Sequence, residues 1–153
     1  MGIKKAFTLV EIILVMSIIA ILFALTVPQL FRLRDRNTLQ NAVTQLISLV
    51  RQQQVNAMNS PSLYGVHFDH ARYTLFKGKQ FISTDSANTV ETFDYPVALT
   101  GIDVPSSQLI FASGSGEIVS FDALHHSLTL GDTVYSENKV IQFNSLGVPT
   151  SIQ

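Results

Sequence analysis

One ionisable residue, Glu11, interrupts a largely apolar stretch that runs from Phe7 to Val27. A carboxylate inside a membrane helix costs about 2.5 to 3.5 kcal/mol on insertion scales, so it needs a partner. In the simplest interpretation Glu11 lies near the membrane interface, in the first turns of a helix whose dipole favours an acidic side chain. In the alternative, removal of residues 1–6 would expose the amine of Phe7, and a neighbouring copy of the chain would present that amine to Glu11.

Four histidines are the other candidates for chemistry, namely His67, His70, His125 and His126. Strand residues three apart, or adjacent, point to opposite faces of a sheet, so neither pair can close on one ion. The chain has no cysteine, and no acidic ligand cluster accompanies the histidines. We therefore expect no metal site.

No set of nucleophile, base and orienting group can be picked out of the sequence, so we expect neither catalytic residues nor a cofactor, and no enzyme. The segment Ser113-Gly114-Ser115-Gly116 is too short for a phosphate-binding loop and lacks its lysine. It is interpreted as a flexible turn.

The composition allows one small domain. The chain has 153 residues and a formal net charge of −1, which gives no overall basic field to attract nucleic acid. Its mean hydropathy of +0.29 is high for a soluble domain, and the apolar excess is concentrated in the first thirty or so positions. Without cysteine, the folded domain must be stabilised by packing alone.

The apolar stretch has the length of a membrane span, because Phe7 to Val27 would cover roughly 30 Å at about 1.5 Å per residue. Lys4 and Lys5 precede it and favour a cytoplasmic N-terminus, although arginines also follow it at positions 32, 34 and 36. A cleavable secretory signal peptide is the competing interpretation. It would need small residues at a cleavage site, which Thr26-Val27-Pro28-Gln29 does not supply.

The residues around Glu11 carry a family resemblance. Lys4-Lys5-Ala6 followed by Phe7-Thr8-Leu9-Val10-Glu11 resembles the class III signal of type IV pilins and type II secretion pseudopilins. The resemblance implies that a prepilin peptidase cuts between Ala6 and Phe7 and methylates the new amine of Phe7, and that Glu11 aids subunit docking. Ala6 stands where the family usually has glycine, and its side chain is small enough to fit.

Pro28 falls where many pilins carry a proline that kinks the long helix. Proline removes a backbone donor and clashes with the preceding turn, so a kink is also expected from its chemistry.

After Pro28 the pattern becomes that of an amphipathic helix that continues to about Met58, where Asn59-Ser60-Pro61-Ser62 ends it. The apolar residues recur at spacings of three and four and should pack on a sheet; they are Leu39, Ala42, Val43, Leu46, Ile47 and Val50. The opposite face is interpreted as solvated and carries Gln40, Asn41, Gln45, Arg51, Gln52 and Gln53.

From Leu63 onward, short runs of β-branched and aromatic residues alternate with turn signals, which is typical of strands. We predict strands at Tyr64–Phe68, Tyr73–Phe76, Val90–Phe93, Gln108–Phe111, Ile118–Phe121, Ser127–Leu130 and Val140–Phe143. A hairpin connection is predicted at residues 67–71 and a second turn at 77–79, so neighbouring strands should be antiparallel. The expected fold class is α+β, with a long N-terminal helix, transmembrane and then amphipathic, packed on an antiparallel β-sheet domain.

Three segments are similar to the GspH/FimT branch of the pilin-like proteins: 50–57, 111–117 and the closing 141–150, in which Gly147 would take a turn conformation closed to most residues. The resulting organisation is a leader at 1–6, a transmembrane and filament-core half-helix at 7–28, an amphipathic half-helix at 29–60 and a β-rich domain at 61–153.

The resemblance implies a structural minor pilin or pseudopilin of a type II secretion pseudopilus or type IV pilus. Its partners would be the prepilin peptidase, other pilins in a helical filament and the inner-membrane assembly platform. The chain would cross the bacterial inner membrane once, with its C-terminal domain outside the cytoplasm.

The alternative is a DNA-binding minor pilin of a competence pilus, because some members of this branch use a basic Gly-Arg motif near the C-terminus. Here that place reads Gly147-Val148-Pro149, without arginine. Affinity for DNA comes largely from Lys and Arg contacts to phosphate, so we do not expect nucleic-acid binding.

Overall fold

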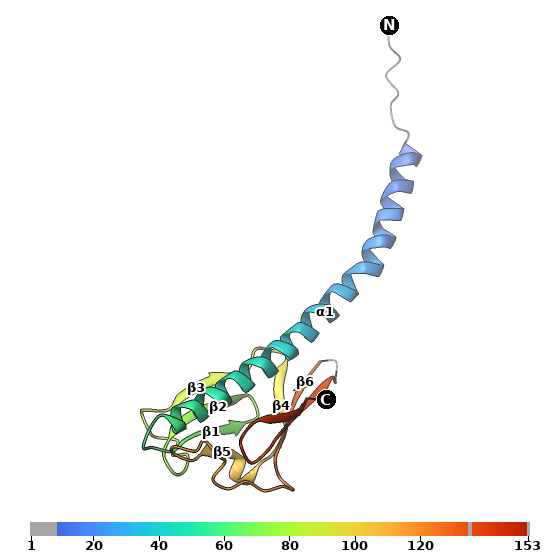
Figure 1. Ribbon diagram of the computed structural model, residues 1–153. Coiled ribbons are helices and arrows are strands. Elements are labelled where there is room, and N and C mark those ends of the chain that lie inside the picture. Colours follow the sequence, from blue (N-terminus) through green and yellow to red (C-terminus); the bar gives the residue numbers. More distant parts are fainter. Residues whose placement is uncertain (1–8, 135, 153) are drawn as a thin grey trace. The chain divides into compact units, whose positions relative to one another are not determined.

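The computed structural model describes residues 9–134 and 136–152, and within this range the side chains of residues 26–37 and 151 are left undescribed. A single helix, α1 (Leu9–Met58), opens the described part of the chain (Figure 1). It ends where the Asn59–Ser62 cluster was expected to end it. Pro28 lies within the bounds of α1, but its side chain is outside the described residues, so the kink stays a prediction.

The chain divides into two compact units, Met1–Arg36 and Asn37–Gln153, so the helix is shared between them. Of the first unit, the structure describes residues 9–25 with their side chains. Among the described residues, no helix is both long and apolar enough to cross a membrane. The predicted span at 7–28 includes residues outside that description and stays a prediction.

The second unit contains two antiparallel sheets. In sheet A the strand order is β3 (Thr89–Thr92), β2 (Arg72–Lys77), β1 (Tyr64–Asp69) and β5 (Gln108–Phe111). In sheet B it is β4 (Val97–Asp103), β6 (Ser127–Asp132), β7 (Asn138–Phe143) and β8 (Pro149–Ile152). A short 3₁₀ helix, η1 (Pro105–Ser107), connects β4 to β5. The class is therefore α+β with antiparallel sheets, as predicted.

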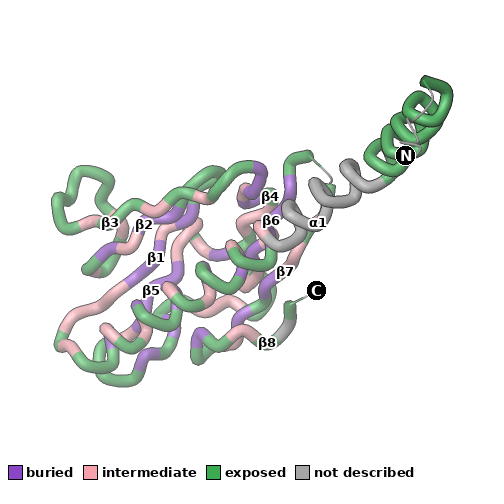
Figure 2. Tube along the Cα trace, turned by 90° about the horizontal axis from the view of Figure 1, so that it is seen from above, coloured by how far each residue is buried: buried purple, intermediate pink, exposed green. Residues whose placement is uncertain are grey.

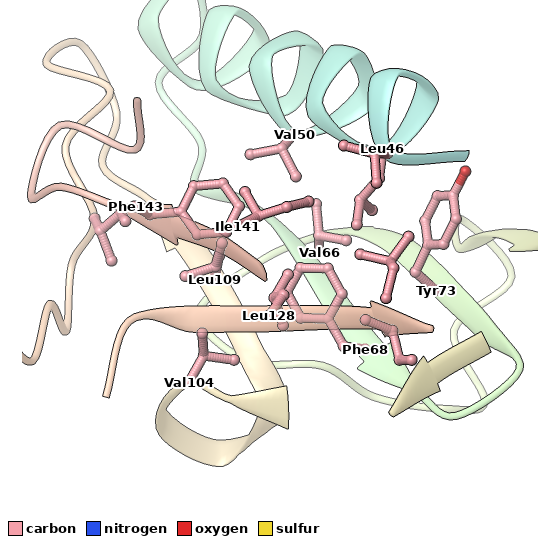
Figure 3. Close-up of a cluster of buried hydrophobic side chains, with 14 of the residues drawn as sticks. Leu46, Val50, Val66, Phe68, Tyr73, Val104, Leu109, Leu128, Ile141 and Phe143 are labelled. Carbon is pink, nitrogen blue, oxygen red and sulfur yellow. The ribbon is translucent and has the colours of Figure 1, made fainter. Parts of the chain in front are cut away.

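One hydrophobic core joins the second part of α1 to both sheets. Leu46 and Val50 point from the helix toward the strands (Figure 3), and both are at most 1% exposed. Figure 2 shows the matching buried positions along β1, β5 and β7. The helix residues in this core recur at spacings of three and four, which confirms the predicted apolar face; they are Leu39, Val43, Leu46, Val50 and Ala57.

Most predicted strands are confirmed, and the predicted hairpin closes tightly, with Asp69 opposite Arg72. The predicted strand at Ile118–Phe121 is wrong. Ile118 forms one isolated bridge with Phe111, and its N–H donates to the carbonyl of Ser145, whereas the next N–H, of Val119, donates to Ile110. Because consecutive donors go to different segments, no ladder forms.

Two strands, β4 and β8, were not predicted. Neither has strong strand propensity, since β4 contains Gly101 and β8 begins with Pro149. They form because β4 pairs with β6 and β8 pairs with β7. Gly147, in the turn between β7 and β8, has a φ of +71°, which confirms the predicted turn conformation.

The C-terminal end of α1 is fastened to the domain by polar contacts. The amide nitrogen of Gln54 donates to the carbonyls of Gly116, at 3.0 Å, and Leu146. The Gly114 N–H donates to the last-turn carbonyl of Ala57 at 3.1 Å, and the Ser113 hydroxyl donates to the carbonyl of Ser60 at 2.6 Å. Carbonyls at a helix end lack partners within the helix, so the bond from Gly114 helps to satisfy the carbonyl of Ala57.

Candidate functional site

The first candidate site is the apolar segment at residues 9–25 of α1. Every residue in it is exposed, and the large apolar side chains range from 41% exposed at Ile19 to 75% at Leu9. The apolar residues cover all sides of the helix rather than one stripe, which is the pattern of a helix that is surrounded by other apolar groups. Monomeric soluble proteins rarely expose an apolar patch of more than a few hundred Å². The segment therefore has the character of a contact surface.

The two polar residues of this segment differ in how they are placed. The Ser17 hydroxyl donates to the carbonyl of Ile13 at 2.7 Å, one turn earlier, so the helix itself satisfies it. Glu11 is exposed and lies in the first described turn of α1, where the helix dipole favours a negative charge. The predicted cleavage and methylation residues, Ala6 and Phe7, lie outside the described residues, as does the proposed pairing of Glu11 with an amine.

The histidines predicted not to form a metal site lie in separate surroundings. His67 stacks on the ring of Phe81, with centroids 4.1 Å apart and planes 7° apart. Burial lowers the pKa of His67, outweighing the opposing effect of Asp69. His70 is exposed at the hairpin between β1 and β2. Over the described part of the chain, no three metal-ligating side chains come together.

His125 makes a polar side-chain contact with β4. Its Nδ1 lies 2.6 Å from Oδ1 of Asp103, and both side chains are more than half exposed. That hydrogen bond, followed by the charge of Asp103, raises the pKa of His125. Nδ1 of His126 is buried and has no hydrogen-bond partner among the described residues. The contact between His125 and Asp103 ties a loop to β4.

The turn that would carry a DNA-binding motif is closed by its own hydrogen bonds. Oδ1 of Asn144 accepts from the N–H groups of Leu146, at 3.1 Å, and Val148, at 2.9 Å. The Gly147 N–H donates to the backbone carbonyl of Asn144 at 2.8 Å. Residues 144–150 contain no lysine or arginine. The turn therefore supplies no cationic contact for phosphate.

A second candidate site lies between α1 and sheet A, at residues for which no function was predicted. A hollow of about 390 Å³ is walled on the helix side by Leu49, Gln52, Gln53 and Asn56. Because these positions are spaced three and four apart, they lie on one side of the helix. The sheet side includes Tyr64 from β1, Lys77 from β2 and Glu91 from β3.

Gln53 corrects one prediction about the helix. Gln40, Asn41, Gln45, Arg51 and Gln52 are exposed as expected, but Gln53 is only 6% exposed. It follows Val50 by three residues and precedes Ala57 by four, so it belongs to the stripe that faces the sheets. Gln53 lines the hollow, and its side-chain nitrogen and oxygen are not among the fully buried atoms that lack a hydrogen-bond partner. The position of Gln53 in the helical repeat, rather than its residue type, could have predicted its burial.

Comparison with protein-family models, with curated proteins and with solved structures gave no match to this chain.

Proposed function

We propose that this protein is a structural, non-enzymatic subunit of a helical filament, a minor pilin or pseudopilin of a type II secretion pseudopilus or type IV pilus. The observation that carries the proposal is the contrast within α1. Residues 9–25 expose apolar side chains on every side, while the helix from Leu39 to Ala57 is packed into a closed core. A filament whose subunits bundle these helices would bury the exposed segment and leave each domain folded.

Burial of this segment would provide a large driving force. Complete transfer of one Val, Leu, Ile, Phe or Met side chain from water is worth about 1.5 to 3 kcal/mol. Before assembly, the same side chains would be covered by lipid in the bacterial inner membrane, with the domain of residues 61–153 outside the cytoplasm. The resemblance of residues 4–11 to a class III signal supports this route. It also supports cleavage between Ala6 and Phe7, methylation of Phe7, and insertion by an inner-membrane assembly platform.

Glu11 is the residue that distinguishes a filament subunit from a plain membrane-tethered domain. In a tethered domain, only the helix dipole would favour this carboxylate among apolar side chains. In a filament, the amine of Phe7 on an adjacent subunit would neutralise Glu11 in surroundings of low dielectric, where an ion pair is strong only if both partners are present.

The test is a Glu11→Ala substitution in cells that make the filament. Processing should continue, but cross-linking to neighbouring subunits and recovery in sheared filaments should fall sharply. Glu117→Ala is the matched control, because Glu117 is exposed on a loop of the domain, and it should assemble normally. Normal incorporation of the Glu11→Ala protein would remove the docking role.

The cut site needs its own experiment. The mass of the mature protein purified from cells should correspond to a chain that begins at methylated Phe7, and replacing Ala6 by a bulky residue such as leucine should block processing. A mature protein that still begins with Met1 would leave Glu11 without its amine. The tethered-domain interpretation would then hold.

A further inference from the structure

We propose that the hollow between α1 and sheet A binds a neutral pyranose unit of a saccharide. This inference is independent of the filament proposal, because it rests only on residues of the second unit. At about 390 Å³, the hollow is at the lower end of the usual range for small-molecule sites, roughly 300 to 1,000 Å³. A single sugar ring is the size of ligand that such a volume holds.

Gln53 is the central residue of the hollow. The residue as a whole is only 6% exposed, but its side-chain nitrogen and oxygen are not among the fully buried polar atoms that lack a partner, so they remain accessible from the hollow. A ligand hydroxyl can therefore take the place of water at this carboxamide. Gln52 and Asn56 place two more carboxamides around the same hollow.

Carboxamides select the chemistry of the ligand. Each one offers both a donor and an acceptor, and so matches groups that also do both, above all hydroxyls. A phosphate or a carboxylate only accepts, and would meet the carboxamide oxygens unfavourably. The lining thus favours a ligand with several hydroxyl groups over an anion.

The charges around the hollow also favour a neutral ligand. Lys77 and Glu91 contribute one positive and one negative charge, so the site has no net charge to attract an ion. Nζ of Lys77 lies 5.7 Å from the ring centroid of Tyr64, within the range of a cation–π contact. The ammonium group is therefore already engaged at the rim.

Apolar side chains supply the remaining wall. Leu49 comes from the helix and Leu75 from β2, and Ala87 lies before β3. A pyranose has C–H groups on its ring faces and hydroxyls around its edge, so it can contact these side chains and the carboxamides at once. Gln52, Lys77 and Thr89 are exposed, which leaves the hollow open to a free sugar or to one unit of a longer saccharide.

The experiment is a titration of the full-length ¹⁵N-labelled chain in dodecylphosphocholine micelles, whose head group contains no sugar. The ligands are glucose, galactose, mannose and N-acetylglucosamine, their short oligosaccharides, and triglycine as a peptide. At least one sugar should shift the side-chain amide resonances of Gln53 and Asn56 saturably. Binding of oligosaccharides alone would mean that the site takes a unit within a chain, and binding of both would mean that it also takes the free sugar.

Gln53→Leu should weaken the binding about tenfold or more, which is the loss of roughly 1.4 kcal/mol expected for a good hydrogen bond. Gln45→Leu is the matched control, since Gln45 is exposed on the same helix, and it should bind as the unchanged protein does. Asn56→Ala gives a second test if Gln53→Leu alters the fold, as judged from the backbone spectrum. Failure of every saccharide to shift these resonances, shifts by triglycine alone, or unchanged affinity in both site variants would overturn the proposal.

Discussion

The two described parts of α1 differ both in apolar content and in surroundings: 15 of the 17 residues at 9–25 are apolar, against 9 of the 19 at 39–57. Between Leu9 and Leu25 every residue is exposed, while from Leu39 to Ala57 the apolar stripe is at most 3% exposed. The second part has apolar residues on one face and finds its partner within the chain. The first has them on all faces, and one small domain cannot cover it. The comparison shows that the chain folds around only part of its helix and leaves the apolar side chains at residues 9–25 exposed.

The largest effect is expected from removing side-chain volume in the packed part. Leu46 is fully buried, so Leu46→Ala should lower the free energy of unfolding by about 2 to 5 kcal/mol. Leu14→Ala, at a position 57% exposed, should change it by less than about 0.5 kcal/mol. Denaturant unfolding of the full chain in detergent, followed by circular dichroism, measures both. Equal losses would contradict the division of the helix.

The packed core is also expected to depend on the turn before β8. A Cβ on Gly147 would lie 2.5 Å from Cε1 of Phe111, and the φ of +71° is strained for other residues. We expect Gly147→Ala to cost about 1 to 3 kcal/mol. Gly114→Ala separates the two causes, because Gly114 has a φ of +80° but no atom within 4 Å of the added Cβ. If both variants lose the same stability, contact with Phe111 contributes nothing.

Alkaline titration should report on the packed region through Tyr73. Burial, and then the charge of Glu91, raise the pKa of Tyr73 to about 12, from 10.0. Below pH 10 this tyrosine is protonated in both states, so it adds no pH dependence. Between pH 10 and about 12 the unfolded chain loses the proton first, and stability should fall. Absorbance at the phenolate band should show one tyrosine ionising only with unfolding, and Tyr73→Phe should remove that late step.

The smallest effect is expected at the exposed pair of His125 and Asp103. Because the pKa of His125 is raised above 6.5 in the folded state, its contribution is complete below that pH and is lost as pH rises through the folded value. Asp103→Asn should lower the midpoint of the His125 ring resonances in an NMR titration. It should also remove a slight fall in melting temperature with rising pH. An unchanged midpoint would mean that the pair does not form in solution.

Elements of the fold that depend on local sequence could be predicted, whereas elements that form by pairing with distant segments could not. The end of the helix near Met58 and strands such as Tyr73–Phe76 follow from local chemistry. The strands β4 and β8 do not, because Gly101 and Pro149 weaken their propensity and distant partners build them. Ile118 has a strand-forming side chain but lacks a ladder partner.

The two candidate sites also differ in whether their residues could be identified from the sequence. The apolar segment and Glu11 could be identified directly, since hydropathy and one charge define them. The hollow could not, because Gln53 resembles its exposed neighbours and only its place in the helical repeat buries it. Lys77 and Glu91 join the hollow through strand pairing, which brings together residues that are distant in the sequence.

The fastening of the helix end has a mechanical consequence. The amide of Gln54 and the carbonyls of Ala57 and Ser60 form hydrogen bonds with four loop residues, Ser113, Gly114, Gly116 and Leu146. Tension applied along α1 would therefore load several bonds together instead of opening them one after another. We expect the last turns of the helix to detach from the domain in a single abrupt event when one molecule is stretched, and a Gln54→Ala substitution to lower the force at which this happens.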